Sequence, residues 1–207
     1  MNMTAMFWNK VAKGYSKKPI DDEAAYQKKL QVTREYFRQD MEVLEFGCGT
    51  GSTALAHAPY VKSILAIDVS SKMLEIAQGK ADAKNIGNVT FKRSAIDTFS
   101  VPNNSLDAVL GLSILHLLDN KEEVITKVHK MLKPGGIFIT STVCIGNFMK
   151  LLKFILPVGK IFGLIIKVFN TKELEDCLIE AGFNIVYQMQ SNEGSVEFII
   201  ATKAESE

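Results

Sequence analysis

The sequence predicts an α/β fold, in which a mostly parallel β-sheet carries helices on both faces. Three observations lead to it. Short apolar runs alternate with helical segments along the chain, and the first run leads directly into a glycine-rich loop. Near the C-terminus, two apolar runs flank a turn signal. Alternating strands and helices form parallel sheets covered by helices, and the final pair of runs adds an antiparallel hairpin.

Five short runs rich in Val, Ile, Leu and Phe are the predicted parallel strands, because strands buried on both faces are continuously apolar. They are residues 43–46, 63–67, 89–92, 108–112 and 137–142. Helices are predicted at residues 22–38, 52–58, 71–83 and 121–132. Ser70 is the expected N-cap of the third helix, and Asp119 with Glu122 predicts a capping box at the fourth, which Gly135 follows.

The C-terminal part of the chain predicts a last helix followed by a β-hairpin. Thr171 is the expected cap of a helix at residues 172–181, which Gly182 ends. The runs 183–189 and 196–202 flank Asn192-Glu193-Gly194, a typical hairpin turn. The length of 207 residues suits a single domain spanning 1–207.

Composition narrows the class of protein. The formal net charge is +1, with 47% hydrophobic and 23% charged residues, which is an ordinary globular balance without a basic nucleic-acid-binding surface. Cys48, Cys144 and Cys177 are far apart and odd in number, so neither a disulfide framework nor a metal site is expected. Residues 1–16 do not resemble a signal peptide. We therefore expect a cytoplasmic protein with no nucleic-acid partner and no metal.

The most informative segment is Gly47-Cys48-Gly49-Thr50-Gly51, which follows a predicted strand and precedes a predicted helix. Glycines permit a tight turn and let the backbone approach a ligand closely. Loops of this kind bind nucleosides at the carboxyl end of a sheet. The alternative is a strand–helix turn that is glycine-rich without binding anything.

Two aspartates favour the binding interpretation. Asp68 ends the second predicted strand about 20 residues after the loop, where an acidic side chain binds a ribose diol. Asp97 follows the third predicted strand, where its carboxylate is placed to accept a hydrogen bond from an adenine amino group. Either residue alone could be a helix cap or a solvated charge.

These motifs, with Leu132-Lys133-Pro134-Gly135-Gly136, resemble the class I S-adenosylmethionine-dependent methyltransferases over about residues 7–203. The similar group includes quinone-biosynthesis C-methyltransferases and other small-molecule enzymes. The resemblance implies a Rossmann-like seven-stranded sheet of order 3-2-1-4-5-7-6 with the last strand antiparallel, an N-terminal helical cap at about 1–40 and a lid-like insertion at about 143–170. It also implies S-adenosylmethionine as cofactor, with contacts at Tyr15, Glu45, Gly47, Cys48, Gly49, Gly51, Asp68, Val69, Met73, Ile96, Asp97 and Leu112.

Several of these residues have a second interpretation. Met73, implied to flank the adenine with Val69, also suits a core position of a helix. Tyr15, implied to close over the cofactor, also suits an anchor for the N-terminal helix. His116, just after the fourth predicted strand, is the candidate catalytic base, and the alternative is a histidine in the wall of the site.

The acceptor is predicted to be a small, apolar molecule, because residues 148–169 are rich in Leu, Ile and Phe. The same segment carries four lysines and no acidic residue, so peripheral contact with anionic membrane is a second interpretation, and a packed amphipathic helix pair is a third. The predicted function is methyl transfer. A non-catalytic adenosylmethionine-binding module is the alternative, and a nicotinamide-dependent oxidoreductase, whose fingerprint is Gly-x-Gly-x-x-Gly, fits less well.

Overall fold

A computed structural model describes residues 3–143, 170–190 and 196–205 of the chain. They form two compact units, Met1–Phe99 and Ser100–Glu207. The first unit contains three parallel strands, β1 (Glu42–Phe46), β2 (Ser63–Asp68) and β3 (Val89–Arg93). Its helical segments are α1 (Met3–Tyr15), α2 (Glu23–Glu35), α3 (Ser52–His57), η1 (Ala58–Tyr60) and α4 (Ser71–Ala83).

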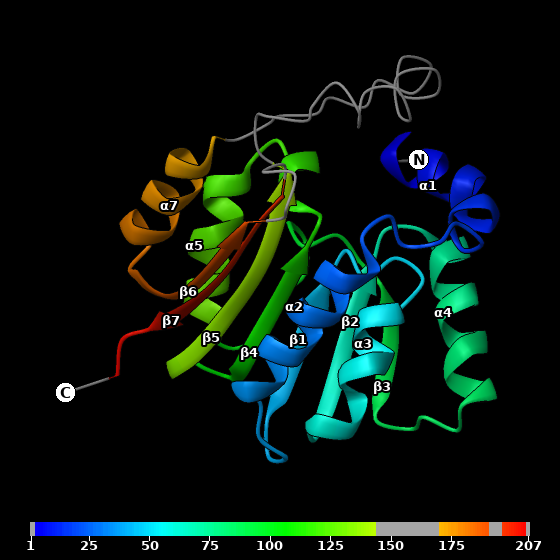
Figure 1. Ribbon diagram of the computed structural model, residues 1–207, viewed down its shortest axis with the longest axis horizontal. Coiled ribbons are helices and arrows are strands. Elements are labelled where there is room, and N and C mark those ends of the chain that lie inside the picture. The colour runs from blue at the N-terminus through cyan, green and yellow to red at the C-terminus, as the bar shows by residue number, and fades with distance from the viewer. Residues whose placement is uncertain (1–2, 144–169, 191–195, 206–207) are drawn as a thin grey trace. The chain divides into compact units, whose positions relative to one another are not determined.

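The helices of the first unit pack in layers on its strands (Figure 1). Helix α4 packs against β2 and β3, α2 packs against α3, and α1 packs against α4. The strands are apolar because both of their faces are covered, and Leu44, Ala66 and Ile67 are fully buried. Ser70 caps α4 as predicted, since its side chain accepts a hydrogen bond from the Met73 N–H.

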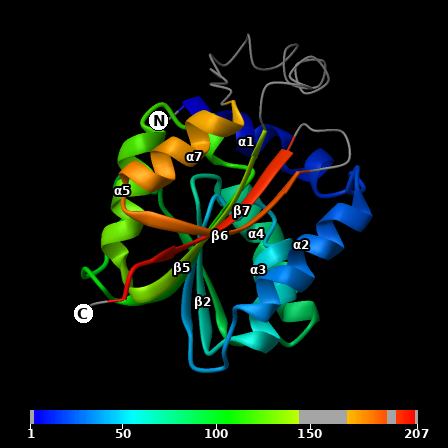
Figure 2. The same ribbon diagram turned by 60° about the vertical axis from the view of Figure 1, so that its left-hand side comes forward.

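The second unit contains β4 (Leu106–Leu112), β5 (Leu132–Val143), β6 (Phe183–Gln190) and β7 (Val196–Lys203). Strands β4 and β5 are parallel, and β7 is antiparallel to both β5 and β6. Its helical segments are η2 (Leu115–Leu117), α5 (Lys121–Met131) and α7 (Thr171–Glu180). Helices α5 and α7 pack against each other, and Figure 2 shows them side by side.

The strand order is β3-β2-β1-β4-β5-β7-β6, which confirms the predicted seven-stranded topology and the antiparallel last strand. The predicted turn at 192–194 and the lid-like segment lie outside the described residues, apart from Val143 and Asn170. The boundaries of the N-terminal cap and of the lid stay predictions.

The N-caps predicted for α5 and α7 are each wrong by one residue. Asn170, not Thr171, caps α7, because Glu173 then stands at the third helical position and its side chain reaches back to the Asn170 N–H. At α5 the N-cap is Asn120, so the predicted pair of Asp119 and Glu122 does not form a capping box.

Strand β5 begins five residues earlier than the predicted strand. Leu132 adopts extended backbone directly after α5 and pairs with Leu106, so the chain has already entered the sheet before Gly135. Gly135 therefore does not end the helix; it lies within β5 with a φ of +71°.

None of the described helices has the combination of length and apolar character that crossing a bilayer requires. Across the described ranges, no three His, Cys, Asp or Glu side chains gather in a group able to hold a metal ion.

Candidate functional site

The glycine loop that leaves β1 has a conformation that depends on its glycines. Gly47, Gly49 and Gly51 have φ values of +67°, +52° and +72°, which other residues rarely adopt. A Cβ atom at Gly51 would lie 2.8 Å from the Ala77 Cβ of α4, so α4 packs directly on the loop. A Cβ atom at Gly49 would meet nothing within 4 Å, so the loop leaves open space on that side.

Asp68, at the end of β2, ties the glycine loop to the neighbouring strand. Its Oδ2 accepts a hydrogen bond from the Gly49 N–H at 2.9 Å, and its Oδ1 accepts one from the Ser70 N–H at 2.8 Å. Burial raises the pKa of Asp68, while these backbone hydrogen bonds oppose the rise. Each carboxylate oxygen keeps acceptor capacity beyond one hydrogen bond, so Asp68 is able to receive two hydroxyl groups as well.

Ser70 joins the same region to the N-terminal helix. The Ser70 Oγ donates to Asn9 Oδ1 at 2.8 Å, and the Asn9 oxygen also accepts from the Lys72 N–H at 3.1 Å. Asn9 on α1 therefore holds the first turn of α4, immediately after Asp68. This contact fixes α1 at the edge of the candidate site.

Glu45 is a second acidic side chain next to the loop, in β1. It is 4% exposed, and among the described residues its Oε2 atom is buried without a hydrogen-bond partner. Burial, and then the charge of Asp68, raise the pKa of Glu45 to about 8. An unpaired buried carboxyl is costly, so this group is suited to a ligand that brings a hydrogen-bond donor or a positive charge.

The arrangement fits a nucleoside with a cationic appendage. The open space beside Gly49 leaves room for the ligand itself. Asp68 offers oxygens to a diol, and Glu45 offers an oxygen without a partner to a cation. These are the groups that S-adenosylmethionine presents, with its ribose and its amino-acid end.

Comparison with known proteins agrees with this chemistry. A family described as "Methyltransferase domain" matches residues 43–136, which include the glycine loop, Asp68, Asp97 and His116. The crystal structure of YcgJ from Bacillus subtilis superposes with a TM-score of 0.71 at 17% identity, covering 87% of this chain and all of that one.

Residues 43–136 thus match a methyltransferase domain, and the fold is that of known methyltransferase structures.

The curated methyltransferases that this chain resembles are distant relatives. YcgJ, an uncharacterized methyltransferase, is 30% identical over 110 residues, 53% of this chain and 44% of YcgJ. Malonyl-acyl-carrier-protein O-methyltransferase from Paenibacillus sp. is 26% identical, over 73% of this chain and 58% of its own. Demethylmenaquinone methyltransferase from Tropheryma whipplei is 30% identical over 58% of this chain and 47% of that protein. The chain thus spans about half the length of the curated relatives it matches.

The other predicted cofactor residues of the first unit differ in their exposure. Cys48 is buried, and burial raises the pKa of its thiol, so it remains protonated at neutral pH. Val69 is half-buried next to Asp68, and Ile96 is buried. Asp97 lies exposed in the turn after β3.

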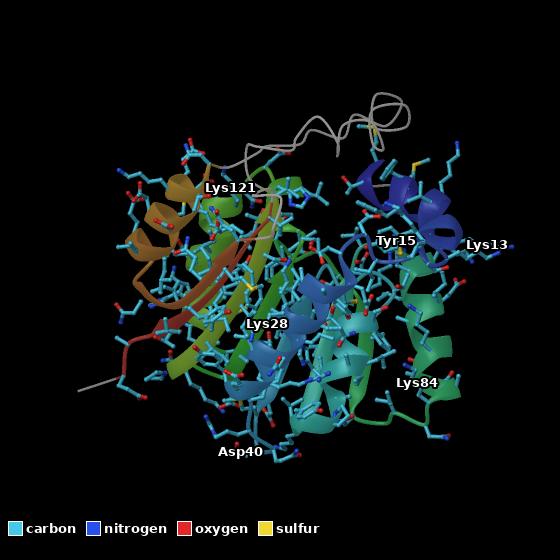
Figure 3. The ribbon with its side chains drawn as sticks, viewed as in Figure 1. Lys13, Tyr15, Lys28, Asp40, Lys84 and Lys121 are labelled. Carbon is cyan, nitrogen blue, oxygen red and sulfur yellow. The ribbon has the colours of Figure 1, made fainter. Side chains whose placement is uncertain are left out.

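The sequence left two interpretations open for Met73 and Tyr15, a contact with the cofactor and a packing role in the protein. Met73 is 2% exposed on the inner side of α4, a core position. Tyr15, labelled in Figure 3, ends α1 and is 54% exposed. Its ring lies edge-on to Trp8, with 6.2 Å between the ring centroids. Partial desolvation of the phenol raises the pKa of Tyr15. Their roles toward the cofactor stay predictions.

His116 lies in η2 of the second unit, after the carboxyl end of β4. It is 4% exposed, and burial lowers its pKa to about 4, so the imidazole is neutral at pH 7. Its Nδ1 lies 3.3 Å from the Thr142 Oγ1 of β5. Leu112, the last residue of β4, is half-buried and pairs with Ser141. A neutral histidine held by a hydroxyl is suited to accept a proton.

Sequence reasoning missed a buried carboxylate beside this histidine. Glu197 pairs with Thr142 across β5 and β7, so the two side chains lie on one face of the sheet. Glu197 is 1% exposed, and its Oε2 accepts a hydrogen bond from the Thr171 hydroxyl at 3.3 Å. In the described part of the chain, its Oε1 is buried without a partner. No local motif marks Glu197, because the strand pairing alone brings it to Thr142.

Sequence reasoning also missed Asn9 and Lys80, which contact the site from α1 and α4. Asn9 is hydrogen-bonded to Ser70, 61 residues further along the chain, and no sequence motif marks it. Lys80 had a usable signal: it stands three residues after Ala77, so both share one face of α4. Once Ala77 is known to face the glycine loop, Lys80 is expected there as well.

The contrast between two glycines gives a first prediction. Gly51→Ala combines a left-handed backbone, costing about 1–3 kcal/mol, with overpacking against Ala77 of about 1–3 kcal/mol. Gly49→Ala carries only the backbone cost, because its Cβ meets open space. In urea unfolding, Gly51→Ala is expected to be the less stable variant by at least about 1 kcal/mol. Equal losses would mean that α4 does not pack against Gly51.

Glu45 gives a prediction of pH dependence. Its folded-state pKa of about 8 lies above the ordinary 4.5, so the stability that its neutral form supplies is complete below pH 4.5 and is lost as pH rises toward 8. The loss is up to about 1.4 kcal/mol per pH unit. Glu45→Gln cannot ionise, so its advantage over the wild type should widen from pH 5 to pH 7.5 in urea unfolding. Glu35→Gln, at an exposed position of α2, is the control; parallel pH profiles for Glu45→Gln and wild type would refute the burial argument.

Proposed function

We propose that this protein transfers a methyl group from S-adenosylmethionine to a small, mainly apolar acceptor. The observation that carries the proposal is the Asp68 carboxylate, which is held against the glycine loop by the Gly49 N–H and is able to accept further hydrogen bonds. The family and the open space above Gly49 support it.

The proposed cofactor contacts are those that the family resemblance implies. Asp68 receives the two ribose hydroxyls, Val69 and Met73 flank the adenine, and Ile96 with Asp97 meets its edge. Gly47, Cys48, Gly49 and Gly51 line the methionine portion, with Leu112 at its end and Tyr15 covering the cofactor. Glu45 faces the positively charged amino group, because that charge relieves the cost of its buried, unpartnered oxygen.

When bound, S-adenosylmethionine supplies a methyl group on a sulfonium that is already activated for in-line displacement. The protein's part is therefore mainly to align the reacting groups and to receive a proton where the acceptor releases one. His116 is our candidate for that proton: its imidazole is neutral at pH 7, and the contact at Nδ1 with Thr142 orients the ring. In the tautomer whose Nδ1–H donates to the Thr142 hydroxyl, Nε2 is the accepting nitrogen.

The proposed acceptor class rests on the family and on the chain's own residues. The relatives include an O-methyltransferase of malonyl-acyl-carrier protein and a demethylmenaquinone methyltransferase. A neutral histidine suits an acceptor that releases a proton, such as a phenol, a quinol or an activated carbon acid. A cytoplasmic location is part of the same proposal.

Binding of the cofactor is the first test. Calorimetry with S-adenosylhomocysteine is expected to give micromolar affinity, with no comparable binding of NAD. Asp68→Ala removes the acceptor of the ribose hydroxyls and should weaken binding about 10- to 150-fold. Asp40→Ala, which removes an exposed carboxylate of the same unit (Figure 3), should change the affinity less than twofold. Tight NAD binding without S-adenosylhomocysteine binding would instead identify an oxidoreductase.

The role of His116 is tested with a panel of phenols and quinols. For an acceptor of this class, His116→Gln should lower the rate of methyl transfer about 10²- to 10⁴-fold while S-adenosylhomocysteine affinity stays within twofold. Thr142→Val keeps the imidazole but removes its hydroxyl partner, and should cause a smaller loss. Full activity of His116→Gln toward a phenol would exclude the histidine as base. Cofactor binding without methylation of any acceptor would favour a non-catalytic module.

A further inference from the structure

The side chain of Lys80 makes three hydrogen bonds to the segment that contains the glycine loop. Its Nζ donates to the Thr50 carbonyl oxygen at 3.1 Å, to the Thr50 Oγ1 at 2.9 Å and to the Ser52 Oγ at 3.0 Å. A lysine ammonium has three donors, so all of them are used on this one segment. Lys80 itself is half-buried on α4.

The glycine loop needs such restraint more than an ordinary turn does. Three of its five residues are glycines with positive φ, and glycine loses more conformational freedom on ordering than any other residue. Two of its amides are already held from the β2 side, where the Cys48 N–H bonds to the Ile67 carbonyl and the Gly49 N–H bonds to Asp68. The Thr50 and Ser52 part is held by Lys80 from α4.

The close packing of α4 on the loop makes this contact possible. Ala77 is fully buried against Gly51, and a single methyl group at Gly51 would already collide with it. Lys80 follows Ala77 by three residues, which is one helical turn on the same face. The missing side chain at Gly51 thus brings α4 close enough for Lys80 to reach across to Thr50.

Electrostatics alone does not explain a lysine at this position. Ser52 is the first residue of α3, and a cation beside the amino end of a helix is unfavourable. The ammonium contributes here through its three donor contacts, which restrain both the backbone and the side chain of buried Thr50.

We infer that Lys80 is a positioning residue that locks the glycine loop in its cofactor-binding conformation before the cofactor arrives. The loop then binds without having to be ordered, and this preorganisation strengthens cofactor affinity. The inference rests on the proposed cofactor site, but the state of the loop in the free protein is measurable independently.

The test compares Lys80→Met, Lys80→Arg and Lys84→Met with the wild type. Met keeps the aliphatic stem and removes the donors, whereas Arg keeps the charge and part of the hydrogen bonding. Lys84→Met removes an equal charge one turn further along α4 (Figure 3) and is the matched control. In hydrogen exchange of the free protein, the Gly51 and Leu55 amides should exchange on the order of tenfold faster in Lys80→Met, while β2 amides stay unchanged.

The same variants are then titrated with S-adenosylhomocysteine. Lys80→Met should bind on the order of tenfold more weakly, Lys80→Arg should recover part of the loss, and Lys84→Met should match the wild type within twofold. In turnover, the KM for S-adenosylmethionine should rise while kcat is unchanged. Unchanged loop exchange in Lys80→Met, or acceleration spread equally over β2 and α4, would overturn the inference. If Lys80→Met speeds exchange of the loop amides but the wild type binds no S-adenosylhomocysteine, the proposed cofactor site is refuted. The restraint of the loop by Lys80 is then still supported.

Discussion

The hydrogen bond from the Gly49 N–H to the Asp68 carboxylate is the contact on which the rest of the site depends. It joins the loop after β1 to the end of β2, two positions that parallel pairing has already brought side by side. Because the second oxygen of Asp68 holds the Ser70 N–H, one carboxylate fixes both the loop and the start of α4. A ligand that binds Asp68 thereby meets two prearranged backbone segments.

Each of the two units keeps polar groups where burial is costly. Glu45 and Glu197 each have a carboxylate oxygen without a partner among the described residues, and His116 is buried as a neutral imidazole. Apolar replacements at such positions often make a protein more stable. Such buried polar groups are typical of functional sites, and this supports the roles proposed above for Glu45 and His116.

Sequence patterns predicted what depends on local chemistry. The apolar runs identified all seven strands, Ser70 was identified as a cap, and the glycines with Asp68 identified the loop and its acidic partner. Prediction was wrong at Thr171 and at Asp119, because a cap one residue earlier or later is decided by which side chain reaches the third helical position. Lys80, Asn9 and Glu197 were missed because their partners are 28 to 63 residues away or are reached through strand pairing.

The missed residues share one physical role. Asn9 restrains the first turn of α4 from α1, and Lys80 restrains the loop from the third turn of α4. Helix α4 is thus fixed at its amino end and in turn fixes the loop, while the packing of Gly51 on Ala77 sets the spacing between them. A glycine-rich loop is by itself flexible, so its binding geometry is a property of the neighbouring helix as much as of the motif. In this chain, the glycine motif marks the proposed cofactor site, and the contacts from α4 are what we infer to hold the loop ready for it.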